Sequence, residues 1–223
     1  MSKAAPARGA SPPSAPGGPP PTPDHIPTGN TYDKYGSTNP VVKRLMAGFE
    51  RQMFELLDQA GPASILDVGC GEGVLTEQWA DRTPGRVVGI DLEDPKLREE
   101  WQRRERPNLT FHAGDGHSLP FGDGEFEVAT AMEVLEHVPD PAAVLGEMAR
   151  VSSRWLLVSV PREPLWRGLN LARGSYVRAL GNTPGHLNHW SKRGFASLLR
   201  RYGEVVELRS PFPWTMALVR VGS

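Results

Sequence analysis

Three acidic or imidazole side chains near the middle of the sequence, Glu133, Glu136 and His137, have types and a spacing that could do chemistry together. They stand at positions i, i+3 and i+4, so on a helical turn they would span about 100° of arc and point the same way. Two carboxylates and an imidazole suit a hard or borderline divalent ion such as Mg²⁺, Mn²⁺ or Zn²⁺. A later segment could return His186 or His189 to the same place as a fourth ligand. We therefore predict that these three side chains and His186 form a metal site, with His189 as the substitute.

A loop with glycine at every second position, 69, 71 and 73, joins an apolar strand-like run to a helix-like run. Glycine suits a loop that a ligand approaches closely and whose torsion angles a side chain would penalise. A dinucleotide would place its pyrophosphate at the start of the helix, but Glu72 puts a carboxylate there, and the third glycine comes one position early for that motif. An adenosine with a cationic sulfonium and an amino-acid tail tolerates this acid, and Asp67 lies close enough to contribute through the amino group or a water. We therefore predict S-adenosylmethionine as the ligand.

The elements that must position these residues follow from the hydrophobic pattern. Apolar residues at helical spacing predict a helix over 40–60, and the charged stretch 93–106 predicts an exposed helix braced by local ion pairs. Asp140 followed by Pro141 is typical of a helix start and predicts a helix that ends at residue 151. The pattern also predicts strands over 65–68, 87–91, 126–132, 155–160, 205–208 and 216–221.

The sequence LDVGCGEG over 66–73 resembles the first motif of the class I methyltransferases, and further segments follow in the order expected of that family. VVGID over 87–91 ends in Asp91, about 20 residues after Gly71, which is the usual separation for an acid that accepts both ribose hydroxyls. FHAGDG over 111–116 resembles the end of the third strand, where the resemblance implies that Asp115 contacts the adenine amino group.

The resemblance implies an α/β fold, a Rossmann-like sheet of seven mostly parallel strands in the order 3-2-1-4-5-7-6, with helices on both faces. It also implies a site for S-adenosylmethionine along the carboxyl ends of the first four strands. The residues predicted to bind the cofactor are Asp67, Gly69, Cys70, Gly71, Asp91, Leu92, Asp115, Gly116 and Glu133.

The segment EVLEHV over 133–138 is similar to that of two subgroups within this family. One subgroup is the O-methyltransferases of ubiquinone biosynthesis. The other is the methyltransferases of the 3′-terminal 2′-oxygen of small RNAs, in which the two glutamates and the histidine bind a metal and a later histidine precedes Trp and Ser, as His186 precedes Trp190 and Ser191. Many members of the wider group carry Glu-His here without a metal. His137 therefore remains either a metal ligand or a catalytic base, with Glu136 beside it.

Residues 161–190 form an insertion with little of the generic family pattern, which we interpret as a substrate lid. Taken as a helix over 165–180, it presents one apolar stripe, with Arg173 at the edge of that stripe beside Trp166 and Tyr176. A guanidinium there could anchor a carboxylate or phosphate, although its stem could also reach water. Residues 162–202 contain eight lysines or arginines against the single acid Glu163. This charge indicates an anionic substrate, an anionic surface, RNA, or only a solvated basic face.

The first 30 residues are rich in Pro, Ala, Gly and Ser, so we expect a disordered tail followed by one methyltransferase domain over 31–223. We find no signal-peptide-like run and no apolar stretch long enough to cross a bilayer, and we expect a cytoplasmic protein. Cys70 is the single cysteine, which excludes an internal disulfide and a thiolate metal site.

Together these features predict O-methylation of a small anionic or glycosidic metabolite, with His137 and Glu136 at the reacting group and Arg173 holding the anion. RNA 2′-O-methylation that depends on a metal is the alternative enzyme. The lack of a separate RNA-binding domain or aromatic platform disfavours it. The non-enzymatic alternative is a scaffold protein that binds S-adenosylmethionine without catalysis. It would give residues 133–137 no function.

Overall fold

The computed structural model describes residues 39–172, 182–183 and 185–222. The predicted tail over 1–30, Arg173 and the second half of the predicted 165–180 helix lie outside the described residues. Among the residues that are described, no helix is long and apolar enough to cross a membrane.

A seven-stranded sheet in the order β3-β2-β1-β4-β5-β7-β6 forms the centre of the fold, as predicted. Neighbouring strands from β3 to β5 pair in parallel, and only β7 runs antiparallel to its neighbours β5 and β6. The strands are β1 Ser64–Val68, β2 Arg86–Asp91, β3 Leu109–Ala113, β4 Phe126–Met132, β5 Ser152–Pro161, β6 Gly203–Arg209 and β7 Trp214–Val221. Because the first five strands are parallel, their carboxyl ends meet at one edge of the sheet, where an open α/β sheet binds its ligands.

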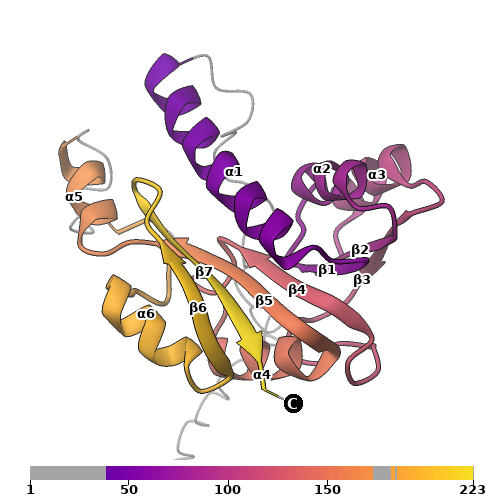
Figure 1. The fold of residues 1–223 in the computed structure, drawn as a ribbon. Coiled ribbons are helices and arrows are strands. Elements are labelled where there is room, and N and C mark those ends of the chain that lie inside the picture. The colour runs from indigo at the N-terminus through magenta and orange to yellow at the C-terminus, as the bar shows by residue number, and fades with distance from the viewer. Residues whose placement is uncertain (1–38, 173–181, 184, 223) are drawn as a thin grey trace, which may run out of the picture.

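Three helices cover one face of the sheet: α1 Pro40–Ala60, α2 Val74–Arg82 and α3 Pro95–Arg104 (Figure 1). The α1 helix has the bounds that the apolar spacing predicts. The side chain of Asn39 caps its start by accepting the N–H of Val41 at 2.9 Å, and the helix ends at Gly61, whose φ of 53° suits a residue without a side chain. The charged α3 helix carries the expected local ion pairs, from Arg103 and Arg104 to Glu100.

The opposite face is covered by α4 Pro141–Val151 and α6 Lys192–Leu199. Side chains alternate between the two faces along each strand, so Ile65 packs on the α1 side and Leu66 on the α4 side. The predicted start of α4 is confirmed, because the Asp140 side chain caps it and Pro141 is its first residue. The α6 helix was not predicted. It has only eight residues, and Ser191, which caps it, had been interpreted as part of a site motif.

The insertion begins at the end of β5, and a single β-bridge joins its two ends. Arg162 pairs with Trp190, and the Glu163 N–H donates to the Trp190 carbonyl at 3.0 Å. Between these points the described chain contains α5 Leu165–Ala172. Trp166 of α5 packs against Trp214 of β7, and Trp214 packs in turn against Phe49 of α1. The two ends of the insertion are therefore joined beside the end of β5. Its α5 helix is connected to α1 through the contacting rings of Trp166, Trp214 and Phe49.

Candidate active site

The glycine loop turns from β1 into α2 directly against the ends of β2 and β4. Gly69, Gly71 and Gly73 all have positive φ, at 74°, 53° and 80°. The N–H groups of Gly69 and Cys70 donate to the Ile90 carbonyl at 2.8 and 3.2 Å. A Cβ on Gly69 would lie 2.5 Å from a methyl carbon of Val134, so a side chain at this position would push the loop off the β4 end.

Asp91 ends β2 with its carboxylate held by two backbone N–H groups. Gly71 donates to Oδ2 and Leu92 donates to Oδ1, both at 2.7 Å. Burial raises the pKa of Asp91, and these two hydrogen bonds act in the opposite direction. The acid is thus fixed at the rim of the glycine loop, with lone pairs left over for a ligand hydroxyl. Leu92 contributes its N–H to this arrangement.

Asp67 lies beneath the loop and is only 3% exposed. The hydroxyls of Thr76 on α2 and Thr130 on β4 donate to its two oxygens at 2.6 and 3.0 Å. Burial raises the pKa of Asp67 to about 7 despite these hydrogen bonds. Neither threonine was predicted, although each is a buried polar residue that faces the core. Asp67 therefore joins β1, β4 and α2 at the base of the site.

Two other predicted cofactor residues lie along the same rim. The side chain of Asp115, after β3, is more than half exposed and accepts hydrogen bonds from the N–H of His117 at 2.9 Å and from its Nδ1 at 2.7 Å. The hydrogen bond from the His117 N–H holds the pKa of Asp115 below its ordinary value. Gly116 lies against β1 and α4, since a Cβ there would be 3.1 Å from Val68. In Cys70, burial raises the pKa of the thiol, so the site does not favour a thiolate.

Glu133 lies apart from Glu136 and His137 because the predicted helical turn over 133–137 is wrong. The chain leaves β4 at Glu133 with a φ of 61°, a conformation that few residues other than glycine adopt, and then makes a single tight turn in which His137 N–H bonds the Val134 carbonyl. Helical spacing therefore does not apply. One carboxylate oxygen of Glu133 instead accepts a hydrogen bond from the buried hydroxyl of Ser159 on β5, at 3.0 Å.

The structure brings Glu136, His137 and His186 together. One ligand atom from each side chain lies within 4.8 Å of the others. Glu136 is 1% exposed and His186 is 9% exposed, whereas His137 is more open. The two imidazole rings stand edge to face with their centroids 4.8 Å apart, and His137 Nε2 is 3.9 Å from Glu136 Oε1. These three side chains, from here on the acceptor cluster, form a group open to solvent on the His137 side.

Residues 185–188 are held against the turn after β4 by backbone hydrogen bonds. The N–H groups of Leu187 and Asn188 donate to the Glu136 carbonyl at 2.7 and 3.1 Å. The side-chain amide of Asn188 donates to the carbonyls of Leu135 and Val138 at 3.1 and 2.7 Å. Asn188 was not predicted, since an asparagine between two histidines in the sequence gives no signal of such a role. Asn188 therefore fixes the position of His186 relative to Glu136 and His137.

Trp166 and Asn170 of α5 support the other side of His186. The Trp166 ring stacks on the His186 ring with centroids 6.2 Å apart, and Trp166 and Asn170 both donate to the Thr183 hydroxyl, at 3.0 and 3.1 Å. The His189 ring lies beside that of His186, with centroids 6.5 Å apart, but its Nε2 is 2.6 Å from Asn182 Oδ1. The group of possible metal ligands among the described residues contains His186 and omits both His189 and Glu133.

The donor set of the acceptor cluster fits a divalent metal. One carboxylate oxygen and two imidazole nitrogens suit Zn²⁺, Mn²⁺ or a similar ion. His137 Nδ1 lies 3.0 Å from the Gly185 carbonyl, and because a carbonyl oxygen can only accept, Nδ1 must carry the proton. The neutral ring then has its lone pair on Nε2, where either a metal or a substrate proton could be bound. A backbone carbonyl that orients a histidine in this way is common at metal sites.

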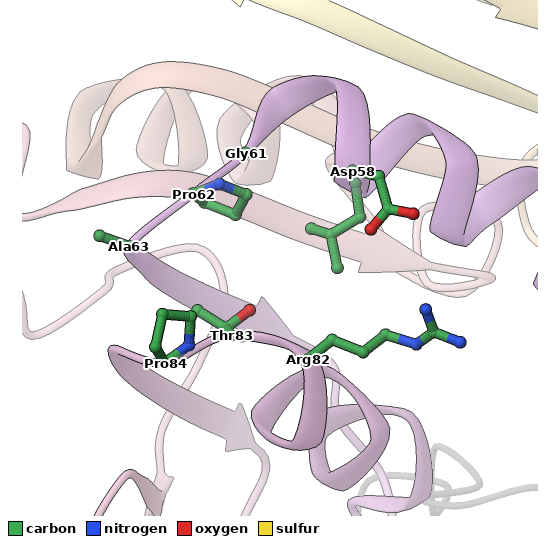
Figure 2. Close-up of a pocket in the computed structure, with 8 residues that line it drawn as sticks. Asp58, Gly61, Pro62, Ala63, Arg82, Thr83 and Pro84 are labelled. Carbon is green, nitrogen blue, oxygen red and sulfur yellow. The ribbon is translucent and has the colours of Figure 1, made fainter.

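A separate hollow of about 380 Å³ lies far from these residues, between the end of α1 and the start of β2 (Figure 2). Its lining includes Asp58 and Arg82, in the last turns of α1 and α2, and Ala63 and Pro84, which precede β1 and β2. An open parallel sheet binds ligands at the opposite ends of its strands. The hollow is therefore not part of the candidate active site.

Comparison with known proteins agrees with this arrangement. Residues 66–154 match the family model described as a methyltransferase domain. The ubiquinone biosynthesis O-methyltransferase of Methylococcus capsulatus is 33% identical over 147 residues, which cover 58% of this chain and 61% of that protein. The demethylmenaquinone methyltransferase of Paenarthrobacter aurescens is 33% identical over 126 residues, which cover 54% and 49%. The chain thus spans less than two thirds of the length of these relatives.

Solved structures share the fold at lower identity. Magnesium protoporphyrin IX methyltransferase from Synechocystis, with bound SAH, superimposes with a TM-score of 0.63 at 19% identity, covering 84% of this chain and 90% of that one. A SAM-dependent methyltransferase from Aquifex aeolicus gives a TM-score of 0.60 at 15% identity and covers 76% and 89%. The strand order, the glycine loop with its acid on β2 and the matched family model together support a class I S-adenosylmethionine-dependent methyltransferase domain in this chain.

Proposed function

We propose that this protein transfers the methyl group of S-adenosylmethionine to a hydroxyl oxygen of a small metabolite. The observation that carries the proposal is the acceptor cluster at the carboxyl end of β4, next to the glycine loop. In methyl transfer the acceptor oxygen attacks the methyl carbon, and the sulfur leaves with the electrons of the broken bond. Catalysis then consists mainly of alignment and of removing the proton from the acceptor.

His137 is the proposed base. Its Nδ1 proton is held by the Gly185 carbonyl, so the basic lone pair is on Nε2, on the side of the ring that lies 3.9 Å from a Glu136 oxygen. A hydroxyl bound between these groups would pass its proton to Nε2 as the new carbon–oxygen bond forms. Glu136 is nearly inaccessible to water and would stabilise the imidazolium that results.

Glu136, His137 and His186 are also the residues that would hold a divalent metal. When bound, the ion would act as a Lewis acid that lowers the pKa of the acceptor hydroxyl. The chelator EDTA separates the two versions of the proposal. Loss of activity in EDTA with recovery on adding Mg²⁺, Mn²⁺ or Zn²⁺ would support the metal, whereas full activity in EDTA would leave His137 as a plain base.

The acceptor is proposed to be anionic or glycosidic because of the basic section 162–202, although Arg173, the proposed anchor, lies outside the described residues. The names of the ubiquinone-biosynthesis relatives favour a small molecule and an oxygen acceptor. The test is incubation with labelled S-adenosylmethionine and a metabolite extract, with mass spectrometry to detect a methyl addition. Label in no product would contradict catalysis and favour a scaffold that binds the cofactor.

RNA 2′-O-methylation is the second candidate, and the proximity of His186 to Glu136 and His137 favours it. The matching test uses two short RNAs that differ only in the 2′-hydroxyl of the terminal ribose. Methylation of the RNA that carries the hydroxyl, with none of the other, would replace the metabolite proposal. Absence of label in both RNAs, with label in a metabolite, would exclude RNA.

A further inference from the structure

The carbonyl of Gly71, in the middle of the glycine loop, is bound by a side chain from outside the loop. Trp101 on α3 donates its indole N–H to this carbonyl at 2.7 Å, from 30 residues along the chain. The N–H of the same glycine donates to Asp91 at 2.7 Å. Both polar groups of Gly71 are therefore held, one by the acid at the end of β2 and the other by the indole.

The Trp101 side chain is also fixed from behind. It is 4% exposed and stacks on Phe111 of β3, with centroids 5.6 Å apart and planes 5° from parallel. Phe111 fills the space in front of Gly73 and Gly89, where a Cβ would lie 2.6 Å from its ring atoms. The indole is thus held by packing on the ring that also lines the back of the glycine loop.

The other tryptophans of the core show that a buried indole in this protein does not need such a partner. Trp79, Trp155 and Trp214 are all less than a tenth exposed, and within the described part of the chain their Nε1 atoms have no hydrogen-bond partner. Among these buried indoles Trp101 stands out because its donor meets the backbone of a loop with three positive-φ glycines, which is costly to order.

We propose that Trp101 is a positioning residue for the cofactor. Its indole N–H holds the Gly71 carbonyl while Asp91 holds the Gly71 N–H, and these two hydrogen bonds together are called the clamp below. The clamp fixes the loop and, through Gly71, the direction in which Asp91 presents its remaining lone pairs to a ribose. This inference rests on the proposed function, since it concerns the binding of S-adenosylmethionine.

The first test is Trp101→Phe, which keeps an aromatic ring on Phe111 and removes the N–H donor. Calorimetry with S-adenosylhomocysteine should show a dissociation constant roughly three- to tenfold higher than that of the wild type, as expected for one lost hydrogen bond. Trp79→Phe is the matched control, because it also replaces a buried indole, but one whose N–H makes no hydrogen bond within the described part of the chain. It should lower the melting temperature without changing the affinity. Equal affinity in Trp101→Phe and the wild type, or equal losses in the two variants, would overturn the proposal.

A double-mutant cycle tests whether both residues act through Gly71. Trp101→Phe combined with Asp91→Ala should lose less affinity than the product of the two single losses, because each variant already releases one of the two peptide groups that meet at Gly71. Fully multiplicative losses would mean that Trp101 acts independently of Asp91, contrary to the clamp.

Hydrogen exchange tests the clamp without any ligand. Peptides covering residues 65–75 should exchange faster in Trp101→Phe than in the wild type and in Trp79→Phe. Unchanged exchange there would overturn the clamp, whatever the affinity data show. Absence of binding heat in the wild type would instead overturn the proposed function and the cofactor role with it, and the exchange result would still decide on the clamp.

Discussion

The ends of β1 to β3 and the end of β4 form two sides of one site, and they are held in different ways. On the first side, here the cofactor side, the glycine loop and Asp91 bind each other through backbone N–H groups within about 20 residues of chain. On the second side, the acceptor side, Glu136 and His137 are positioned by residues 185–188, which return from about 50 residues later. The contact between the glycine loop and Asp91 is local, whereas the acceptor side depends on the insertion being docked.

This difference predicts that the cofactor side and the acceptor side have separate roles, and mutations on each side can test that prediction. If the cofactor side is self-contained, changes on the acceptor side should remove turnover and leave cofactor binding intact. Changes on the cofactor side should weaken cofactor binding first. An acceptor-side change that weakens cofactor binding as much as turnover would contradict the division.

His137→Ala is expected to have the largest effect. Loss of a base or of a ligand at the reacting group should lower the rate of methyl transfer by roughly 10²- to 10⁴-fold. S-adenosylhomocysteine should bind with unchanged affinity in calorimetry. His189→Ala is the control, because its ring faces Asn182, and it should retain activity. Equal activity in the two variants would remove His137 from the mechanism.

Asp67 should make stability depend on pH. Burial raises its pKa to about 7 in the folded protein from an ordinary value near 3.8, so the unfolded chain ionises at lower pH than the folded one. The free energy of unfolding should therefore fall as pH rises from about 4 to about 7, by up to roughly 4 kcal/mol, and this contribution should then stay constant. Urea unfolding at several pH values should show a flatter profile for Asp67→Asn. Parallel profiles for the two proteins would contradict this origin.

Asp91→Ala should weaken binding of S-adenosylhomocysteine by roughly 2–4 kcal/mol, because two charge-assisted hydrogen bonds to ribose hydroxyls are lost. Calorimetry measures this directly. The rate at saturating cofactor should change far less than the affinity, which is the reverse of the pattern expected for His137→Ala. Wild-type affinity in Asp91→Ala would remove this residue from the cofactor site.

Asn188→Ala should have a smaller effect. It removes two hydrogen bonds that hold residues 185–188 against the turn after β4, so His186 should lose its fixed position relative to Glu136. We expect activity to fall roughly three- to thirtyfold with cofactor affinity unchanged. His186→Ala in the same background should then add little, and a full additional loss would mean that Asn188 does not act through His186.

The strand order that the family resemblance implied is confirmed. The bounds of α1 are also confirmed, because the apolar spacing that predicts them lies within one element, which Asn39 and Gly61 cap. The cofactor roles of Asp91 and Asp115 remain predictions. Thr76 and Trp101 were missed, since their contacts with Asp67 and Gly71 depend on how α2 and α3 pack.

The acceptor side could be predicted only in part, and Glu133 shows why. Its spacing to Glu136 and His137 suggested a shared helical face, but the chain must turn sharply as it leaves a buried parallel strand, and the positive φ of Glu133 separates it from them. Sequence spacing also could not choose between His186 and His189. The choice depends on Asn188 and on the docking of the insertion, which are contacts between distant parts of the chain.

The position of β7 in the sheet has a consequence for the order in which the strands can pair as the chain is made. In the finished sheet β7 lies between β5 and β6, and it pairs with β5 from Trp155 to Pro161. A nascent chain that has emerged only as far as β6 therefore has β5 with an open edge and an apolar centre that includes Leu157 and Val158. Such an edge can pair with another chain. β7, which follows β6 in the chain, is thus the strand that covers this edge of β5.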